Sequence, residues 1–261
     1  MSSELSQNPI TAANGSGFPL QIATVSLVNQ SEHWRVILEE HPWHQNESGS
    51  EGFIDVVALC RRRNLEIMVM ECKRVRQSGW VFLVPKTPPT PRSHATSWVS
   101  QRVDQKWVKY GWESWPADPA SYLSYYCAIP GQEQGRKNLL ERVASDLIDS
   151  VEALADQEKE LNSRPNINTF SRVYVPVIVT TAQLFVAHFD PRDISIQDGS
   201  LPKETPFEEV PYVRFRKSLA TKCDLGAASS VMDIHNFSER TIFIVNSEHL
   251  SKFLAEFELN G

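Results

Sequence analysis

The sequence predicts an α/β fold in which a central mixed β-sheet is flanked by helices. Two apolar strand patterns run as a hairpin through residues 52 to 73, and amphipathic helical patterns lie before and after them. Further apolar strand patterns begin near residues 174 and 241. With 261 residues, 41% of them hydrophobic, the chain can form one large domain or a domain with an insertion.

The segment before the hairpin is expected to contain a tail, a helix and a strand. Residues 1 to 17 are rich in Ser, Asn and Gly, which predicts a disordered tail. Pro19 suits the start of a helix, and apolar residues then recur at helical spacing up to about Gln30. Residues 34 to 44 indicate a strand, with a short helix as the alternative.

An aromatic and proline-rich insertion is expected at about residues 77 to 135 of a domain that spans 18 to 261. This insertion holds five of the seven tryptophans. Rings interleaved with Arg102, Lys106 and Lys109 offer a stacking platform for unpaired bases. We favour the other interpretation, a lid whose rings pack in a small core of their own, because buried aromatic side chains are the commoner case.

The remaining elements follow from the hydrophobic periodicity. Residues 137 to 161 predict a long amphipathic helix that covers the sheet. Strands are predicted at 174 to 181, 184 to 189 and 241 to 245, and no element is predicted between 191 and 238. The last helix is expected to turn four apolar side chains inward: Leu250, Phe253, Leu254 and Phe257.

Three charged side chains interrupt the apolar hairpin: Asp55, Glu71 and Lys73. Charges on a buried strand are costly unless they are paired or bind a metal ion. All three have the same parity, so they share one face, and a three-residue loop would set Asp55 opposite Glu71 or Lys73. Two carboxylates meeting an ammonium group predict a divalent metal site with a helper lysine. A structural salt bridge is the alternative.

This pattern resembles the PD-(D/E)xK superfamily, the restriction-endonuclease-like nucleases. Asp55 in F-I-D-V-V-A and Glu71-Cys72-Lys73 match the family motif, while Ile54 stands where the family has proline. The match covers roughly residues 18 to 84 and extends loosely to about 190. The resemblance implies a metal-dependent DNA endonuclease in which Mg²⁺ or Mn²⁺ is bound by Asp55, Glu71 and the main-chain carbonyl of Cys72. Lys73 would orient or deprotonate the attacking water.

Gln21 is a supporting residue of the same resemblance. Nucleases of this type with an acidic first helix carry a glutamate after a short apolar lead, and F-P-L-Gln21 occupies that place. An amide brings no negative charge for a second ion, so one metal ion is the natural stoichiometry. The neutral residue also favours an alternative function, a catalytically reduced nuclease-fold protein that acts as a nucleic-acid-binding or scaffold subunit.

The distribution of charge predicts a nucleic-acid partner, with DNA preferred. The net charge is −6, yet residues 61 to 109 hold eleven Lys and Arg against three Asp and Glu. A solvated turn is the alternative for part of this segment, and the sequence leaves open whether a homodimer or a protein partner supplies target recognition. The candidate phosphate contacts are Arg61, Arg62, Arg63, Arg74 and Arg76.

Cysteine usage and hydropathy predict a cytoplasmic protein without a membrane segment. The four cysteines form no C-x-x-C pair and no zinc spacing, which suits a reducing compartment. No run of 18 apolar residues is present in the chain. Cys72 has the opposite parity to Glu71, so its thiol is expected to point away from the charged face.

Overall fold

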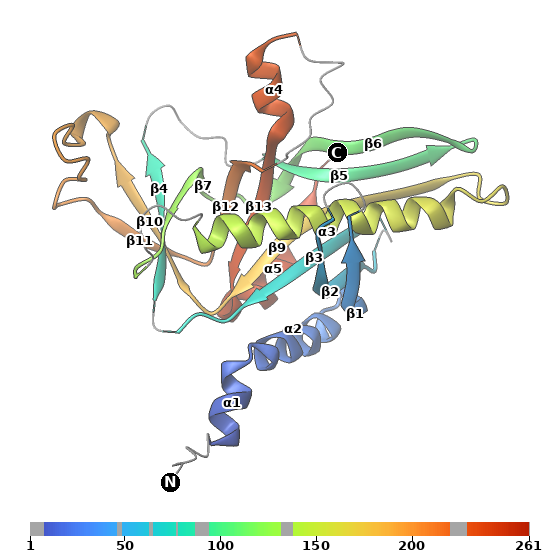
Figure 1. Ribbon diagram of the computed structural model, residues 1–261, viewed down its shortest axis with the longest axis horizontal. Coiled ribbons are helices and arrows are strands. Elements are labelled where there is room, and N and C mark those ends of the chain that lie inside the picture. The colour runs from blue at the N-terminus through green and yellow to red at the C-terminus, as the bar shows by residue number, and fades with distance from the viewer. Residues whose placement is uncertain are drawn as a thin grey trace.

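A mixed sheet of ten strands runs through the centre of the molecule in the computed structural model, with helices on both of its faces (Figure 1). This arrangement confirms the expected α/β class with a central mixed sheet. The structure describes residues 8–45, 49–62, 65–76, 78–86, 94–131, 138–219 and 229–260.

The helices and strands follow one another in an alternating order. The helices are α1 (Pro9–Gly15), α2 (Phe18–Gln30), α3 (Leu139–Asn162), α4 (Val231–Ser238) and α5 (Leu250–Glu256). The strands of the first half are β1 (Trp34–His44), β2 (Glu51–Cys60), β3 (Glu66–Lys73), β4 (Gly79–Pro85), β5 (His94–Val103), β6 (Lys106–Asp118), β7 (Leu123–Ser124) and β8 (Tyr126–Ala128). Those of the second half are β9 (Phe170–Thr180), β10 (Gln183–Phe189), β11 (Phe207–Val210), β12 (Tyr212–Ser218), β13 (Glu239–Asn246) and β14 (Glu258–Leu259).

The central sheet has the strand order β1-β2-β3-β9-β13-β12-β7. The first three strands pair antiparallel, whereas β9 lies parallel to both β3 and β13. Strand β5 also pairs with the first half of β9 and carries β6 with it. The chain therefore runs from α2 through an antiparallel meander, crosses over by way of α3, and returns as a parallel strand beside β3.

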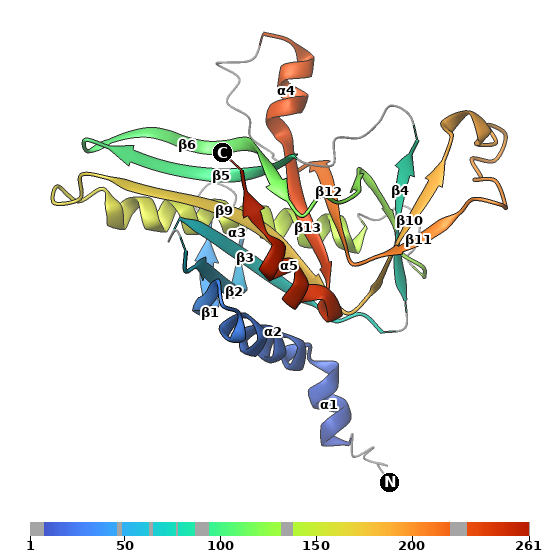
Figure 2. The same ribbon diagram turned by 180° about the vertical axis from the view of Figure 1, so that it is seen from behind.

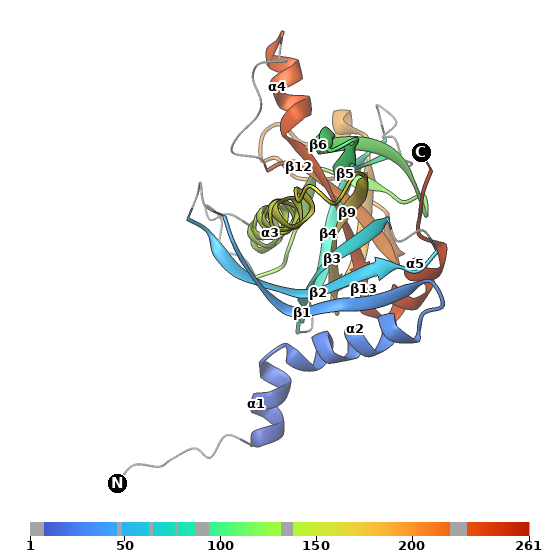
Figure 3. The ribbon, with the colours of Figure 1, turned by 90° about the vertical axis from the view of Figure 1, so that its right-hand side faces the viewer.

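Alternating side chains of the β2–β3 hairpin divide between two hydrophobic cores. Residues such as Val57 and Val69 pack with α3, whose Leu147 and Val151 belong to the same core. Their neighbours in sequence pack on the other face with α2 and α5, as Met70 does. Figure 3 shows α3 on one side of the sheet and α2 with α5 on the other. Strands buried on both faces need this nearly continuous apolar sequence.

Several elements differ from the sequence-based expectations. Residues 9–15 form helix α1, which was expected to be part of the disordered tail, because Asn8 caps the helix and Pro9 suits its first turn. Residues 1–7 of that tail lie outside the described part of the chain. Between 191 and 238, where no element was expected, the chain forms β11, β12 and α4.

The described part of the 77–135 segment adds strands to two sheets. Strands β4 and β8 belong to a second sheet of order β11-β10-β4-β8, while β5 and β6 extend beside α3 as a long arm (Figure 2). The rings of this arm face α3: Trp98 and Tyr110 stack edge to face at 5.0 Å, and the Trp112 indole donates to Glu152 at 2.8 Å. These aromatic side chains therefore pack on the long helix and do not form a separate core.

Helix hydropathy bears on the expected absence of a membrane segment. Among the described residues, none of the helices combines the length and the apolar character needed to cross a lipid bilayer.

Candidate active site

Strand β2 separates from β3 at Asp55. The last backbone pair of their ladder joins Val56 to Met70, and the register then sets Asp55 across from Glu71. The Cys72 backbone N–H donates to Oδ2 of Asp55 at 2.7 Å. The carboxylate thus takes up a backbone donor just beyond the end of the ladder, where an unpaired N–H would otherwise be costly.

The face of strand β2 changes at the same place. Ile54 and Val56 have the same parity, yet Ile54 packs in the core beside α3 and Val56 packs in the core beside α2. Beyond this point β1 and β2 curve together around α3 (Figure 3). Asp55 therefore sits at a turning point of its strand, where its side chain can reach the end of β3.

Glu71 and Lys73 lie on the β3 side of the same point. The Lys73 ammonium is 2.7 Å from Oε1 of Glu71, and these side chains are 36% and 20% exposed for Lys73 and Glu71. Asp55 lies near enough for its charge to act on both. The structure therefore brings together the three charged residues that the sequence placed on one face. Strand β2 ends at Cys60 and β3 begins at Glu66, so the connection is longer than the three-residue loop considered for the hairpin.

Burial dominates the electrostatics of the two carboxylates. Desolvation raises the pKa of Glu71 to about 7, and the nearby Asp55 charge adds to the effect. Desolvation also raises the pKa of Asp55, against the Cys72 N–H and the Lys73 charge. Burial opposes the charge of Lys73, but the Glu71 carboxylate outweighs it and raises the Lys73 pKa. One lysine therefore compensates two partly buried acids incompletely.

Gln21 lies in the first turn of α2 and is 8% exposed. Its amide donates to the main-chain oxygen of Asp55 at 3.1 Å and also to Oε1 of Glu40. The predicted supporting residue therefore contacts the backbone of the candidate site and joins α2 to β1. Its two donated hydrogen bonds also explain why a glutamine rather than a carboxylate fits beside Glu40.

Glu40 is an additional acidic residue that the sequence analysis did not single out. It lies between the pairs Glu39–Val56 and His41–Ile54, so it stands across from Asp55, and its charge helps to raise the Asp55 pKa. Its φ of 48° is unusual for a residue other than glycine. A positive φ cannot be read from the sequence, whereas the β1–β2 register would have pointed to this residue.

Cys72 and α3 complete the surroundings. The Cys72 thiol is buried on the opposite face, where it contacts the Thr24 hydroxyl at 3.6 Å, as its parity predicted. On the α3 side, the exposed Asp146 lies near enough to act electrostatically on Glu71 and Lys73. Asp146 was also missed, because its proximity depends on how α3 packs across the sheet.

The predicted basic surface is divided between the two ends of the hairpin. Arg61 donates to the Trp34 carbonyl at 2.8 Å, and Arg62 contacts the His33 ring. This turn lies about six residues from Asp55, which at the rise of a strand is about 20 Å. Arg63 lies outside the described residues. The structure therefore does not bring this turn to the carboxylates.

Arg74 and Arg76 lie at the other end, directly after Lys73. The Arg74 guanidinium donates to the carbonyl of Asn14 at the end of α1, and Arg76 lies against Gly15. Both side chains are exposed. Of the five arginines that we selected as phosphate contacts, these two adjoin the candidate site.

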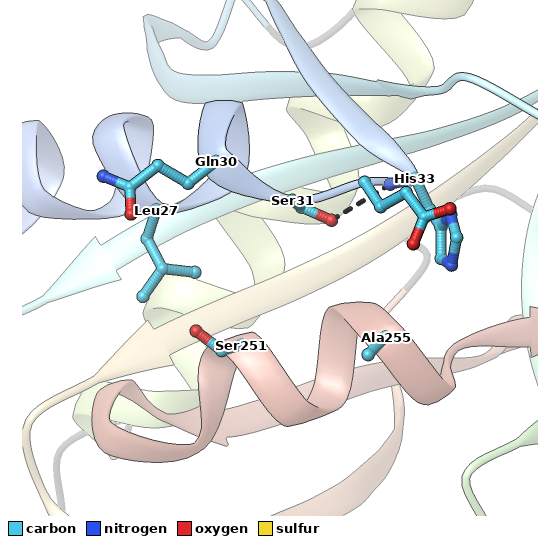
Figure 4. A pocket seen from close by; sticks show the side chains of 7 residues that line it. Leu27, Gln30, Ser31, His33, Ser251 and Ala255 are labelled. Carbon is cyan, nitrogen blue, oxygen red and sulfur yellow. Dashed lines mark hydrogen bonds between the residues drawn. The ribbon is translucent and has the colours of Figure 1, made fainter.

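A pocket of about 290 Å³ lies between the end of α2 and α5 (Figure 4). His33 lines it and also contacts Arg62, so the pocket adjoins the turn of the hairpin rather than the carboxylates. Its lining residues are Leu27, Gln30, Ser31, Glu32, His33, Ser251 and Ala255.

The donor set can be compared with the needs of a metal ion. Within the described residues, no group of three or more His, Cys, Asp and Glu side chains is arranged to hold a metal. Magnesium needs fewer, because it takes one or two carboxylates and keeps several waters. Asp55 and Glu71 supply hard oxygen ligands of that kind, and their raised pKa values leave a need for positive charge that a divalent ion would meet. The residues fit one Mg²⁺ or Mn²⁺ ion.

Comparison of the chain with models of protein families, with curated proteins and with solved structures found no match.

We expect Glu71→Gln to stabilise the metal-free protein by about 2 kcal/mol near pH 8. The folded-state pKa of Glu71, about 7, lies above its ordinary value of 4.5, so the folded protein binds the proton more tightly than the unfolded chain. Wild-type stability should therefore fall as the pH rises through this window, while the amide is insensitive to it. Urea denaturation in EDTA near pH 5 and pH 8 measures the difference.

The exposed Glu204→Gln variant is the control for this measurement, and it should change stability equally at both pH values. Equal stabilities of Glu71→Gln and the wild type near pH 8 would show that burial does not govern Glu71.

Proposed function

We propose that the protein is a metal-dependent endonuclease of the restriction-endonuclease-like type, which hydrolyses phosphodiester bonds of DNA with Mg²⁺ or Mn²⁺. The observation that carries the proposal is the meeting of Asp55, Glu71 and Lys73 at the end of β3, where β2 turns away. Two carboxylates with raised pKa values and one ammonium group are the residues that such a reaction needs.

The order of the surrounding elements supports the same proposal. Helix α2 precedes the hairpin that carries Asp55, and α3 covers the sheet on the face of Glu71 and Lys73. Gln21 of α2 contacts the backbone of Asp55 from the opposite side. This is the placement that the resemblance implies for the first helix, the motif strands and the second helix.

Each residue has a distinct role in the proposed reaction. Asp55, Glu71 and the main-chain carbonyl of Cys72 would hold the ion. When bound, the metal polarises the scissile phosphate and lowers the pKa of a bound water. The Lys73 ammonium lies beside Glu71, where it can orient the attacking water and stabilise the charge that develops on the phosphate.

A second candidate function is that of a nuclease-fold subunit that binds nucleic acid without cleaving it. Two contacts favour it: the Lys73–Glu71 ion pair and the Cys72–Asp55 hydrogen bond give every charged group of the site a partner within the protein. The neutral Gln21 favours it too. The two candidate functions differ in whether added metal ions produce cleavage.

We expect Asp55→Asn, Glu71→Gln and Lys73→Met each to lower plasmid cleavage in Mg²⁺ or Mn²⁺ by at least roughly a hundredfold. All three substitutions preserve side-chain size, and the amide oxygen that replaces the Asp55 carboxylate can still accept the Cys72 N–H. EDTA should abolish wild-type cleavage. Calorimetry should show lost Mg²⁺ binding for the two carboxylate variants and retained binding for Lys73→Met.

The exposed Asp193→Asn variant serves as the control and should cleave at the wild-type rate. Wild-type cleavage by all three site variants would reject the assignment. Metal-independent nucleic-acid binding without any cleavage by the wild type would favour the second candidate.

Gln21→Glu should make the stability of the protein depend more strongly on Mg²⁺. The substitution removes two donated hydrogen bonds and sets a carboxylate beside Glu40, so we expect a loss of about 1–3 kcal/mol in EDTA. A divalent ion near the new charge should recover part of this loss. Thermal melts over a Mg²⁺ titration measure the recovery.

Gln21→Leu is the matched control, because it loses the same donors without gaining a charge. Identical Mg²⁺-induced shifts for the Glu and Leu variants would show that Gln21 lies outside the reach of the metal site.

The two ends of the hairpin should contribute differently to DNA binding. We expect Arg74→Ala/Arg76→Ala to flatten the dependence of log K on log salt by up to about 0.9 per lost phosphate contact, on duplexes of about 8 and about 30 base pairs. Arg61→Ala/Arg62→Ala should do so only on the longer duplex, since about 20 Å separates this turn from Asp55. Equal effects of the two pairs on the short duplex would contradict the separation.

A further inference from the structure

Helix α1 lies on the surface beside the candidate active site although it buries none of its residues. Its side chains are exposed throughout, including Ile10 at 60%. A helix of seven residues is unstable in isolation, so its position depends on contacts with the rest of the protein. Figures 1 and 2 show α1 next to the segment that leaves β3.

The contacts come from the two arginines that follow Lys73. Arg74 donates to the carbonyl of Asn14, and the Arg76 guanidinium lies 3.3 Å from the position that a Cβ on Gly15 would occupy. The carbonyl end of a helix carries partial negative charge, which attracts cationic side chains. Helix α1 therefore occupies the two basic groups that adjoin the candidate site.

The chain after α1 is suited to a change in the direction of the helix. Ser16 ends α1, and Gly17, with a φ of 89°, precedes α2. Glycine adopts this left-handed conformation and others at little cost. Because no apolar side chain of α1 is buried, moving the helix would not open the hydrophobic core.

We propose that α1 is an autoinhibitory strap, which holds Arg74 and Arg76 until a nucleic-acid backbone displaces it. The proposal rests on the proposed function and adds regulation to the same site. A phosphate oxygen is a charged acceptor and binds a guanidinium more strongly than a peptide carbonyl does. A phosphodiester backbone that reaches Lys73 would therefore compete with the Asn14 carbonyl for Arg74.

Destabilising α1 in the full chain tests this strap. Ala12→Pro removes the hydrogen bond from the Ala12 N–H to the Asn8 carbonyl and breaks the helix, whereas Ala12→Ser at the same exposed position retains it. We expect Ala12→Pro to bind a 30-base-pair duplex at least roughly fivefold more tightly than the wild type, in EDTA to prevent cleavage. Ala12→Ser should bind as the wild type does.

Hydrogen exchange without DNA tests the contact itself. Arg74→Ala/Arg76→Ala should speed exchange of the α1 amides, and the remote Arg192→Ala should not. Unchanged α1 exchange, or equal DNA affinity of Ala12→Pro and the wild type, would overturn the strap and leave the nuclease proposal standing. Absence of DNA binding by every variant would instead remove the proposed function, and the strap with it.

Discussion

The hydrogen bond from the Cys72 amide to the Asp55 carboxylate is the interaction on which the candidate site depends. It satisfies a backbone donor at the place where β2 leaves β3, and so allows the two strands to separate without a lost hydrogen bond. The separation lets β1 and β2 curve around α3, and it leaves the Asp55 carboxylate at the end of β3 beside Glu71. Strand pairing, sheet curvature and the site thus share one cause.

This arrangement has an electrostatic cost. Two carboxylates and one lysine are partly withdrawn from water, and burial raises the pKa of both acids. A protein selected for stability alone would gain little from such a group, because apolar side chains of similar size satisfy a buried strand more cheaply. The incomplete compensation by Lys73 is what makes a divalent cation a fitting additional partner.

The surroundings of the site also link the two faces of the sheet. From the α2 side, Gln21 contacts the Asp55 backbone and Glu40, while α3 brings Asp146 to the opposite face. Helix α1 extends the contact to Arg74, directly after the site lysine. Binding at this end of β3 would therefore be felt by three helices, whereas the Arg61–Arg62 turn and its neighbouring pocket lie about 20 Å away along the strand.

The sequence by itself determined the regular elements and the shared face of Asp55, Glu71 and Lys73, because strand parity and helical periodicity are local properties of the chain. It could not determine the neighbours of that face. Glu40 stands across from Asp55 through strand register and a positive φ, and Asp146 approaches through the packing of α3. The folding of α1 and the separation of the hairpin arginines likewise depend on contacts between distant segments. Only the tertiary structure decides these, because they arise from non-local packing rather than from periodicity.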